Sequence, residues 1–166
     1  MITTGRLILR RARAGDLADL HVVLSDAQAM RYWSTPPHSD LAATAVWLDR
    51  LLAVDPAGSV EFVVEHQGRV IGTAGGGTLP EVGFILHPDF WGKGLAFEAM
   101  QAVIAHAFAR HRLDHLRADV DPRNLASVGL LQRLGFALCG HAKNTFCVAG
   151  AWSDSDYYRL NRPSAV

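Results

Sequence analysis

The sequence predicts a mixed α/β domain over residues 1–166, with a mostly antiparallel sheet flanked by helices. A chain of 166 residues has the length of one domain with one core. Hydrophobic residues make up 49% of it and charged residues 19%, which excludes a permanently disordered chain. Short β-rich runs bounded by glycine alternate with longer runs that have apolar residues at helical spacing, and this alternation is typical of α/β folds.

The first third of the chain predicts one strand and two helices. Leu7-Ile8-Leu9, flanked by arginines, is a short strand, and Asp16 opens an amphipathic helix over 17–24. After Pro36-Pro37, either Ser39 or Asp40 caps a second helix whose apolar positions repeat on one face over 41–52.

The middle of the chain predicts a hairpin and a third strand. The β-rich runs 60–66 and 69–74 are separated by Gln67-Gly68, and the glycines at 75–77 should end or bulge the second run. Residues 81–86 form a further strand, which Pro88 ends.

The last part of the chain predicts a β-α-β-α-β series. A long helix follows the Gly92-Lys93-Gly94 turn, a strand covers 116–120, and a helix over 124–134 ends at Gly135. Another strand starts at Phe136, the last covers 156–160, and 162–164 is a frayed tail.

Charge and cysteine content exclude several classes of protein. Lys plus Arg and Asp plus Glu number 16 each, so the net charge is zero and we expect neither nucleic acid nor a membrane as partner. Cys139 and Cys147 are too few and too far apart for a disulfide framework or a CxxC metal site, so no metal is predicted. Arginines interrupt the apolar N-terminus, and no apolar run has the length of a membrane span, which predicts a cytoplasmic protein.

Residues 88–96, PDFWGKGLA, form a turn between a strand and a helix. Such a turn offers free backbone N–H groups and a positive helix end to a phosphate, although Gly94 could also serve only the turn geometry. No GxxxxGK[ST] motif occurs, and Phe97 stands where a dinucleotide fingerprint has a small residue. The common nucleotide motifs are therefore absent or unlikely.

The turn resembles the acyl-CoA pyrophosphate loop of the GNAT N-acetyltransferase superfamily, Q/R-x-x-G-x-G/A. Gly94 and Ala96 match its small positions, and Trp91 replaces Gln or Arg, as in the branch that resembles Rim-type ribosomal-protein N-terminal acetyltransferases. The resemblance spans nearly the whole chain through five further landmarks: 5–10 with Asp16, 81–84, Asn124, Ser127 and 134–136.

This resemblance implies a GNAT-type fold and acetyl-CoA as cosubstrate. The backbone of Phe84 and Leu86 would pair with the pantetheine arm, as an added strand would. The pyrophosphate would be held at the turn and helix start, which comprise Trp91, Gly92, Lys93, Gly94, Leu95, Ala96 and Phe97. Lys93 would add a point charge there or would simply be a solvated lysine.

Asn124 and Ser127 are the next residues that the resemblance singles out. Asn124 would bind the cofactor arm, whereas from its position alone it is a helix N-cap. Ser127 would protonate the departing thiolate, or would be an ordinary first-turn hydroxyl. Many GNAT enzymes have a tyrosine seven positions after the asparagine, but here that position is Leu131. A thiol with a pKa of about 8.5 leaves without a strong acid, so Ser127 or water suffices.

The acceptor side is predicted from residue types near the expected strand end. Glu81 is the first candidate to accept the proton of the amine, with His87 and His38 as rivals. Aromatic side chains suit a pocket for an amine or a peptide end. Candidates are Tyr32, Trp33, His38 and Trp152, together with Phe146 and Trp47, of which Trp47 is better explained by core packing.

The predicted reaction is direct transfer of an acetyl group from acetyl-CoA to a primary amine in a ternary complex. A peptide N-terminal amine, with a pKa of about 7.7–8.0, needs less help to lose its proton than a lysine amine near 10.4, and so is preferred. Alternatives are acetylation of a polyamine or antibiotic amine, a non-catalytic acyl-CoA-binding module, and a nucleotide-binding domain. The sequence leaves open whether the protein forms a homodimer.

Overall fold

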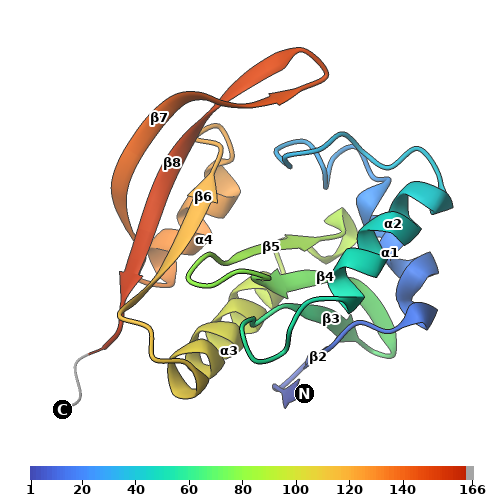
Figure 1. Cartoon of the computed structure of the whole chain (residues 1–166), viewed down its shortest axis with the longest axis horizontal. Helices are drawn as coiled ribbons and strands as arrows, with labels where there is room; N and C mark the ends of the chain where they lie inside the picture. Colours follow the sequence, from blue (N-terminus) through green and yellow to red (C-terminus); the bar gives the residue numbers. More distant parts are fainter. Residues whose placement is uncertain (164–166) are drawn as a thin grey trace.

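The computed structural model describes residues 1–163, which form two antiparallel sheets and four α-helices (Figure 1). The five-stranded sheet has the order β1-β2-β3-β4-β5, and the three-stranded sheet has the order β6-β8-β7. The strands are β1 (Ile2–Thr3), β2 (Ile8–Arg10), β3 (Phe62–His66), β4 (Arg69–Gly75), β5 (Gly83–Leu86), β6 (His115–Val120), β7 (Ala137–Val148) and β8 (Ala151–Asn161). The helices are α1 (Leu17–Leu24), α2 (Leu41–Leu52), α3 (Leu95–Arg110) and α4 (Leu125–Arg133), with 3-10 turns at Ala14–Asp16 and Pro88–Phe90.

Helices cover both faces of the five-stranded sheet. Phe62 and Val64 of β3 pack into the core that α3 and α4 complete, whereas Val63 packs against α1 and α2. Successive side chains of a strand point to opposite faces. Helices α1 and α2 accordingly lie on one side of the five-stranded sheet, and α3 lies on the other (Figure 1). The continuous apolar run of β3 is explained by this burial on both sides.

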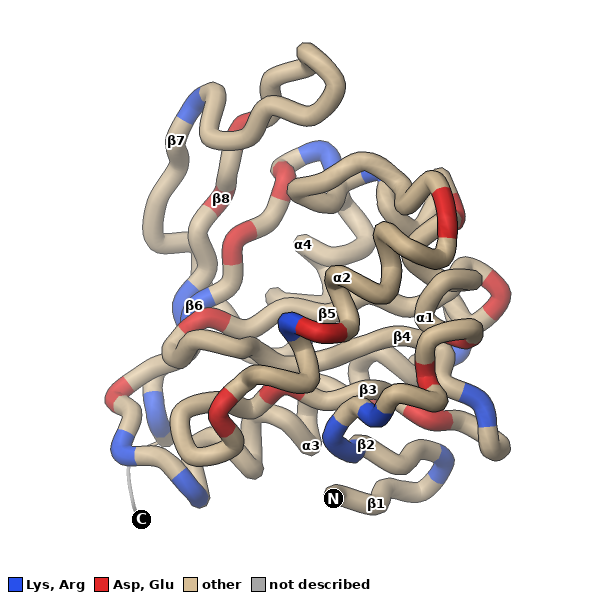
Figure 2. The backbone as a smooth tube through the Cα atoms, turned by 45° about the vertical axis from the view of Figure 1, so that its right-hand side comes forward, with Lys and Arg blue, Asp and Glu red and all other residues tan. Residues whose placement is uncertain are grey.

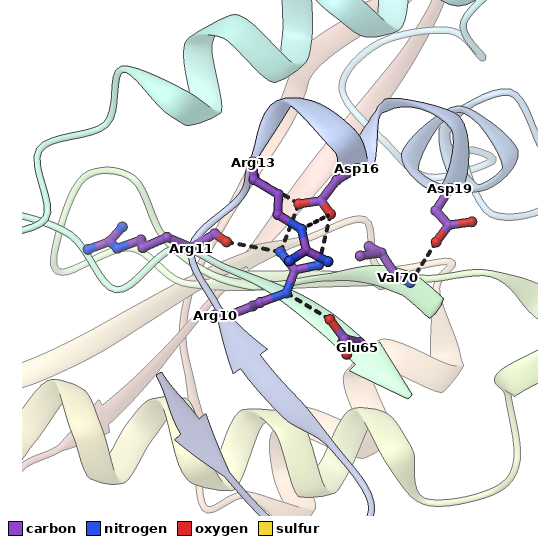
Figure 3. A network of polar contacts seen from close by, with 7 residues as sticks. All are labelled: Arg10, Arg11, Arg13, Asp16, Asp19, Glu65 and Val70. Atoms are coloured by element: carbon purple, nitrogen blue, oxygen red, sulfur yellow. Dashed lines mark hydrogen bonds and ion pairs between the residues drawn. The ribbon is translucent and has the colours of Figure 1, made fainter. Parts of the chain in front are cut away.

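A buried ion pair fixes the passage from β2 to α1 (Figure 3). The Arg10 guanidinium donates to both carboxylate oxygens of Asp16, at 2.9 and 2.8 Å, and its Nε donates to Glu65 on β3 at 2.7 Å. Burial opposes ionisation of Asp16, but Arg10 and the N–H of Arg13 outweigh it and hold the pKa of this carboxyl below its ordinary value. Asp16 therefore precedes α1, as predicted, and links it to the sheet.

Most predicted elements are confirmed. Asp40 caps α2 by accepting a hydrogen bond from the N–H of Ala43, and β3 and β4 form the predicted hairpin. Gly94 precedes α3 and Gly135 follows α4, both with positive φ.

The predicted fold class is confirmed, since antiparallel sheets are flanked by helices. The strands form two sheets, and within residues 1–163 these are joined by a single parallel bridge from Glu81 to Arg117. Two expectations need correction. The last strand begins at Ala151, five residues earlier than predicted, so β7 and β8 form a long hairpin. Arg162 is anchored, because its N–H and guanidinium donate to main-chain oxygens of residues 111–114. Ser164, also predicted to fray, lies outside the described residues.

Charged residues of both signs are distributed along the chain rather than gathered on one element (Figure 2). Among the helices described, none combines the length and the apolar character required to cross a membrane.

Candidate functional site

The site begins where β5 and β6, the facing edges of the two sheets, separate. The N–H of Val82 donates to Arg117 O at 2.8 Å, and the N–H of Arg117 donates to Pro80 O at 2.9 Å. Within residues 1–163, no strand pairing continues between β5 and β6 beyond this junction. A cavity of about 720 Å³, here called the larger cavity, occupies the gap between β5, α3, β6 and α4.

The open edge of β5 lines the larger cavity. The N–H of His87 donates to Ile71 O on β4 at 2.9 Å. This bond determines which residues of β5 point their main-chain groups toward β4 and which point them away. The main-chain groups of Phe84 and Leu86 therefore point away from β4 and toward the gap. Leu86 O accepts a 2.8 Å hydrogen bond from the indole Nε1 of Trp91, so Phe84 and the Leu86 N–H remain for an external partner.

The start of α3 forms the floor of the larger cavity. Gly94 has φ +74°, a left-handed conformation that places the chain at the helix entry without the strain that a side chain would bring. Leu95, Ala96 and Phe97 follow, and their N–H groups precede the first possible i→i−4 bond within the helix. All four residues line the cavity. Among residues 1–163 these donors have no partner, so the helix start offers free N–H groups and a positive end to an anion.

Trp91 and Lys93 flank this turn differently. Trp91 lines the larger cavity, and its indole joins the turn to β5. Lys93 is not among the residues that line it; its ammonium donates to Asp89 O at 2.8 Å and lies 5.6 Å from the centre of the Phe90 ring. The predicted role of its charge remains a prediction.

The N-terminus of α4 forms the opposite wall. Asn124 Oδ1 accepts a 3.2 Å hydrogen bond from the N–H of Ser127, so Asn124 is the N-cap. Its Nδ2 donates to no side chain or main chain within residues 1–163. Asn124, Ser127 and Leu131 all line the larger cavity, and Leu131 is otherwise buried.

A second cavity of about 490 Å³, here called the smaller cavity, lies on the other side of the junction. Trp33, Val82, Gly83 and Asp119 line both cavities, so ligands bound in the two would meet at this shared wall. The smaller cavity is also lined by the glycines at 75–77 and by Trp47, Arg50, Leu51, Val54, Glu61, Thr73, Thr78 and Glu81.

Glycines form the backbone wall of the smaller cavity because the chain passes there at very close range. A Cβ on Gly75 would lie 1.8 Å from Val60 O, and one on Gly76 would lie 1.8 Å from Glu81 O. No side chain fits at either position without moving a strand.

Three carboxyl groups and one guanidinium, that of Arg50, line the smaller cavity. Burial raises the pKa of Glu61 to about 7, against the opposing charge of Arg11. Burial also raises the pKa of Asp119, to which the charge of Glu81 contributes in the same direction. The cavity therefore favours a cation and contains a carboxyl group that can exchange a proton near neutral pH.

Several sequence-predicted residues are brought together here. Tyr32 lines the larger cavity, Trp33 lines both, and Glu81 lines the smaller one from an exposed position at the junction. Trp47, for which core packing was the preferred explanation, both packs against the core and lines the smaller cavity.

Other candidates lie outside both cavities. The His38 ring bonds to Thr44 Oγ1 at 2.9 Å, and His87 Nδ1 accepts from the N–H of Asp89. Trp152 and Phe146 are on the β7–β8 hairpin with 59% and 40% of their surface exposed. None of these four side chains reaches the cavities as they stand.

Sequence reasoning missed Glu61 and Asp119. Both are charged residues within runs that the sequence predicts as strands, 60–66 and 116–120. A carboxyl group in a run of predicted strand residues was the sequence signal that could have indicated these two residues.

The arrangement suits an elongated ligand that carries amide groups at one end and a diphosphate at the other. The β5 edge can pair with the amides, and the α3 start can bind the anion. The smaller cavity can hold a cation next to the amide end of that ligand.

Comparison with known proteins identifies one family. Residues 6–137 match the model of the acetyltransferase (GNAT) domain. The chain is 30% identical over 142 residues to the uncharacterized N-acetyltransferase p20 of Bacillus licheniformis, which covers 80% of each chain.

Two relatives with named substrates are also similar. The spermidine N(1)-acetyltransferase of Escherichia coli K12 is 26% identical over 89% of this chain and 81% of its own. The ribosomal protein uS5-alanine N-acetyltransferase of the same organism is 34% identical over 49% of this chain and 42% of its own. Among solved structures, spermidine N-acetyltransferase from Vibrio cholerae in complex with CoA and spermine shares the fold. Its TM-score is 0.79 at 22% identity, over 95% of this chain and 96% of that one.

Proposed function

This chain belongs to the GNAT acetyltransferase family and is an acetyl-CoA-dependent N-acetyltransferase, and on that premise we propose that its acceptor is the N-terminal amine of a peptide or protein. The wall shared by the two cavities, formed by Trp33, Val82, Gly83 and Asp119, supports direct transfer to an amine. An acyl donor in the larger cavity and an amine in the smaller one would meet at this wall, as direct transfer requires. The similarity to a ribosomal-protein-alanine N-acetyltransferase supports a peptide amine as that acceptor.

The larger cavity fits acetyl-CoA. Phe84 and the Leu86 N–H offer strand-like hydrogen bonds to the two amides of the pantetheine arm, since they face the gap without a partner among residues 1–163. The N–H groups of Gly94 to Phe97 would hold the pyrophosphate at the positive end of α3. Asn124 Nδ2, on the opposite wall, would donate to a carbonyl of the arm.

When bound, acetyl-CoA supplies an activated acetyl group and a thiolate leaving group. The acceptor amine, held as an ammonium by the carboxylates of the smaller cavity, must first lose a proton. Glu81 at the junction would accept it, directly or through water, and Ser127 would stabilise or protonate the thiolate from the α4 side. Leu131 supplies no acid, so the thiolate would leave with a hydrogen bond from the Ser127 hydroxyl and take its proton from solvent.

A small cationic amine is the second candidate acceptor, and the charges of the smaller cavity favour it. Glu61, Glu81 and Asp119 outnumber Arg50 there, and an amine with more than one positive charge would satisfy more than one of them. The similarity to a relative named spermidine N(1)-acetyltransferase supports the same class. The similarity to a ribosomal-protein-alanine N-acetyltransferase supports the first.

A panel of amines with detection of released thiol tests the proposal. It should include short peptides with free α-amines, the same peptides with blocked N-termini, lysine peptides, and diamines and polyamines. Turnover only with free peptide α-amines supports the first candidate, and turnover only with polyamines moves the assignment to the second. Thiol release that no amine accelerates contradicts both.

A further inference from the structure

Arg6, which precedes β2, contacts the turn before α3 from outside the larger cavity. Its Nη1 donates to Lys93 O at 2.8 Å, and its Nε donates to Glu98 Oε2 at 2.7 Å in the first turn of the helix. A Cβ on Gly94 would lie 3.5 Å from Arg6 Nη2. Arg6 itself lines neither cavity.

The contact with Lys93 O fixes the orientation of a peptide plane. In a trans peptide, the carbonyl of one residue and the N–H of the next point in opposite directions. The Lys93 carbonyl is held outward by Arg6, so the N–H of Gly94 in the same plane points to the opposite side. That side is the larger cavity, which Gly94 lines.

The contact with Glu98 balances a charge that would otherwise oppose an anion. Glu98 accepts from Thr4 Oγ1 at 2.6 Å and from the Arg6 N–H at 2.8 Å, in addition to the guanidinium. Burial disfavours its ionised form, but Thr4 and Arg6 outweigh burial and hold the pKa of Glu98 below its ordinary value. The carboxylate is thus ionised near the helix start, where Arg6 neutralises it.

We infer that Arg6 is a positioning residue for acetyl-CoA: it directs the Gly94 N–H at the pyrophosphate and neutralises Glu98 beside it. The inference rests on the proposed function, in that the turn before α3 must be the pyrophosphate site. It assigns a binding role to a residue that lines neither cavity and precedes Lys93 by 87 residues in the sequence. Acetyl-CoA affinity therefore depends on the N-terminal segment.

The test is Arg6→Met, which keeps much of the side-chain bulk and removes both polar contacts. The Kd of CoA, measured by calorimetry, should rise about tenfold, the effect of losing hydrogen bonds to a charged group. S-acetylpantetheine ends before the pyrophosphate, so its kcat/KM should stay within about twofold of the wild-type value. Arg6→Lys keeps the charge but cannot bridge Lys93 O and Glu98 together. Its Kd for CoA should lie between those of the wild type and Arg6→Met.

Arg159→Met is the matched control. Arg159 is exposed on β8, and within residues 1–163 its side chain bonds only to Asn161, so the variant loses a surface arginine of the second sheet. It should bind CoA as the wild type does. Unchanged CoA affinity in both Arg6 variants overturns the inference, and so does an equal loss with CoA and S-acetylpantetheine. Failure of the wild-type protein itself to bind CoA contradicts the proposed site instead.

Discussion

Trp91 and Leu86 are joined by a 2.8 Å hydrogen bond from the indole Nε1 to the main-chain carbonyl oxygen. The bond ties the turn before α3 to the end of β5. It also removes the Leu86 carbonyl from the groups that a ligand can reach. The strand edge and the helix start, the two surfaces proposed to bind acetyl-CoA, are therefore held in one arrangement by one side chain.

Replacing this indole should weaken cofactor binding moderately. Trp91→Phe keeps an aromatic ring but loses the donor, and we expect the Kd of CoA to rise about fivefold, the effect of one neutral hydrogen bond. Calorimetry measures this change. Trp152→Phe, at an exposed position outside both cavities, should leave CoA affinity unaltered. Equal affinities for all three proteins would mean that the bond has no part in binding.

Gly94→Glu should abolish acetyl-CoA binding. The variant places a side chain and a negative charge where the N–H groups are proposed to meet the pyrophosphate, and it strains a residue at φ +74°. Gly150→Glu separates these effects, because Gly150 has φ +81° and open space around it on the β7–β8 hairpin. We expect Gly150→Glu to lose stability but to bind CoA. If a folded Gly94→Glu protein binds CoA normally in calorimetry, the pyrophosphate assignment is wrong.

Ser127→Ala should lower kcat without changing the affinity for acetyl-CoA. A general acid contributes about 10²–10⁴-fold to the rate, and we expect the low end because the thiolate is a tolerable leaving group. Steady-state kinetics measure the change in kcat. Full activity of Ser127→Ala would indicate that water assists the thiolate.

Asn124→Asp should raise the KM for acetyl-CoA with the helix intact. The variant keeps the capping oxygen but loses the Nδ2 donor. Steady-state kinetics distinguish this effect on KM from the effect of Ser127→Ala on kcat.

Glu81→Gln should depress kcat/KM at every pH if Glu81 removes the proton of the amine. With a peptide α-amine as acceptor, the wild-type profile should rise to a plateau with an apparent pKa of about 7–8, set by the amine. Both pH profiles, that of the wild type and that of Glu81→Gln, are measured from initial rates over a range of pH with the best acceptor of the amine panel. A profile that keeps rising beyond about pH 9 would contradict the peptide acceptor and favour polyamines or other small amines.

Glu61→Gln should stabilise the protein more at high pH than at low pH. Burial raises the pKa of Glu61 from 4.5 to about 7, so the folded state favours the protonated form. The stability associated with that proton is fully present below the pKa of Glu61 in the unfolded state. It is lost as the pH rises through the pKa of Glu61 in the folded state. From about pH 5 to pH 8, the gain of Glu61→Gln over wild type in the free energy of unfolding should grow by roughly 1–3 kcal/mol. Denaturant titrations at the two values measure it, and a gain that does not change with pH would show that Glu61 is ionised throughout.

Local sequence signals predicted the elements that local chemistry determines. Asp40 caps α2, Gln67-Gly68 turns between β3 and β4, and Asn124 caps α4, all through contacts within a few residues. The β7–β8 hairpin was underestimated because its first strand is mostly exposed and lacks the alternation of a half-buried strand.

The site was predictable only where one segment carries it. The turn before α3 and the start of α4 are each continuous in sequence, so their motifs could be recognised. The smaller cavity combines residues from Trp33 to Asp119, and no spacing indicates that Glu61 and Glu81 face one space. Arg6 meets Lys93 across 87 residues, a contact that only the pairing of β2 with β3 and the packing of α3 bring about.

If the smaller cavity holds the acceptor, as proposed, Gly75 and Gly76 limit how the choice of acceptor can change. Their peptide groups form one wall of the smaller cavity, and any larger residue would displace Val60 or Glu81. Substitution there would displace neighbouring backbone before it reshaped the cavity, so a change of the proposed acceptor has to come from lining side chains elsewhere, such as Trp33, Trp47 and Arg50. These side chains belong to α2 and the segment before it rather than to the sheet. A library for altered acceptor choice should vary these three positions and keep both glycines.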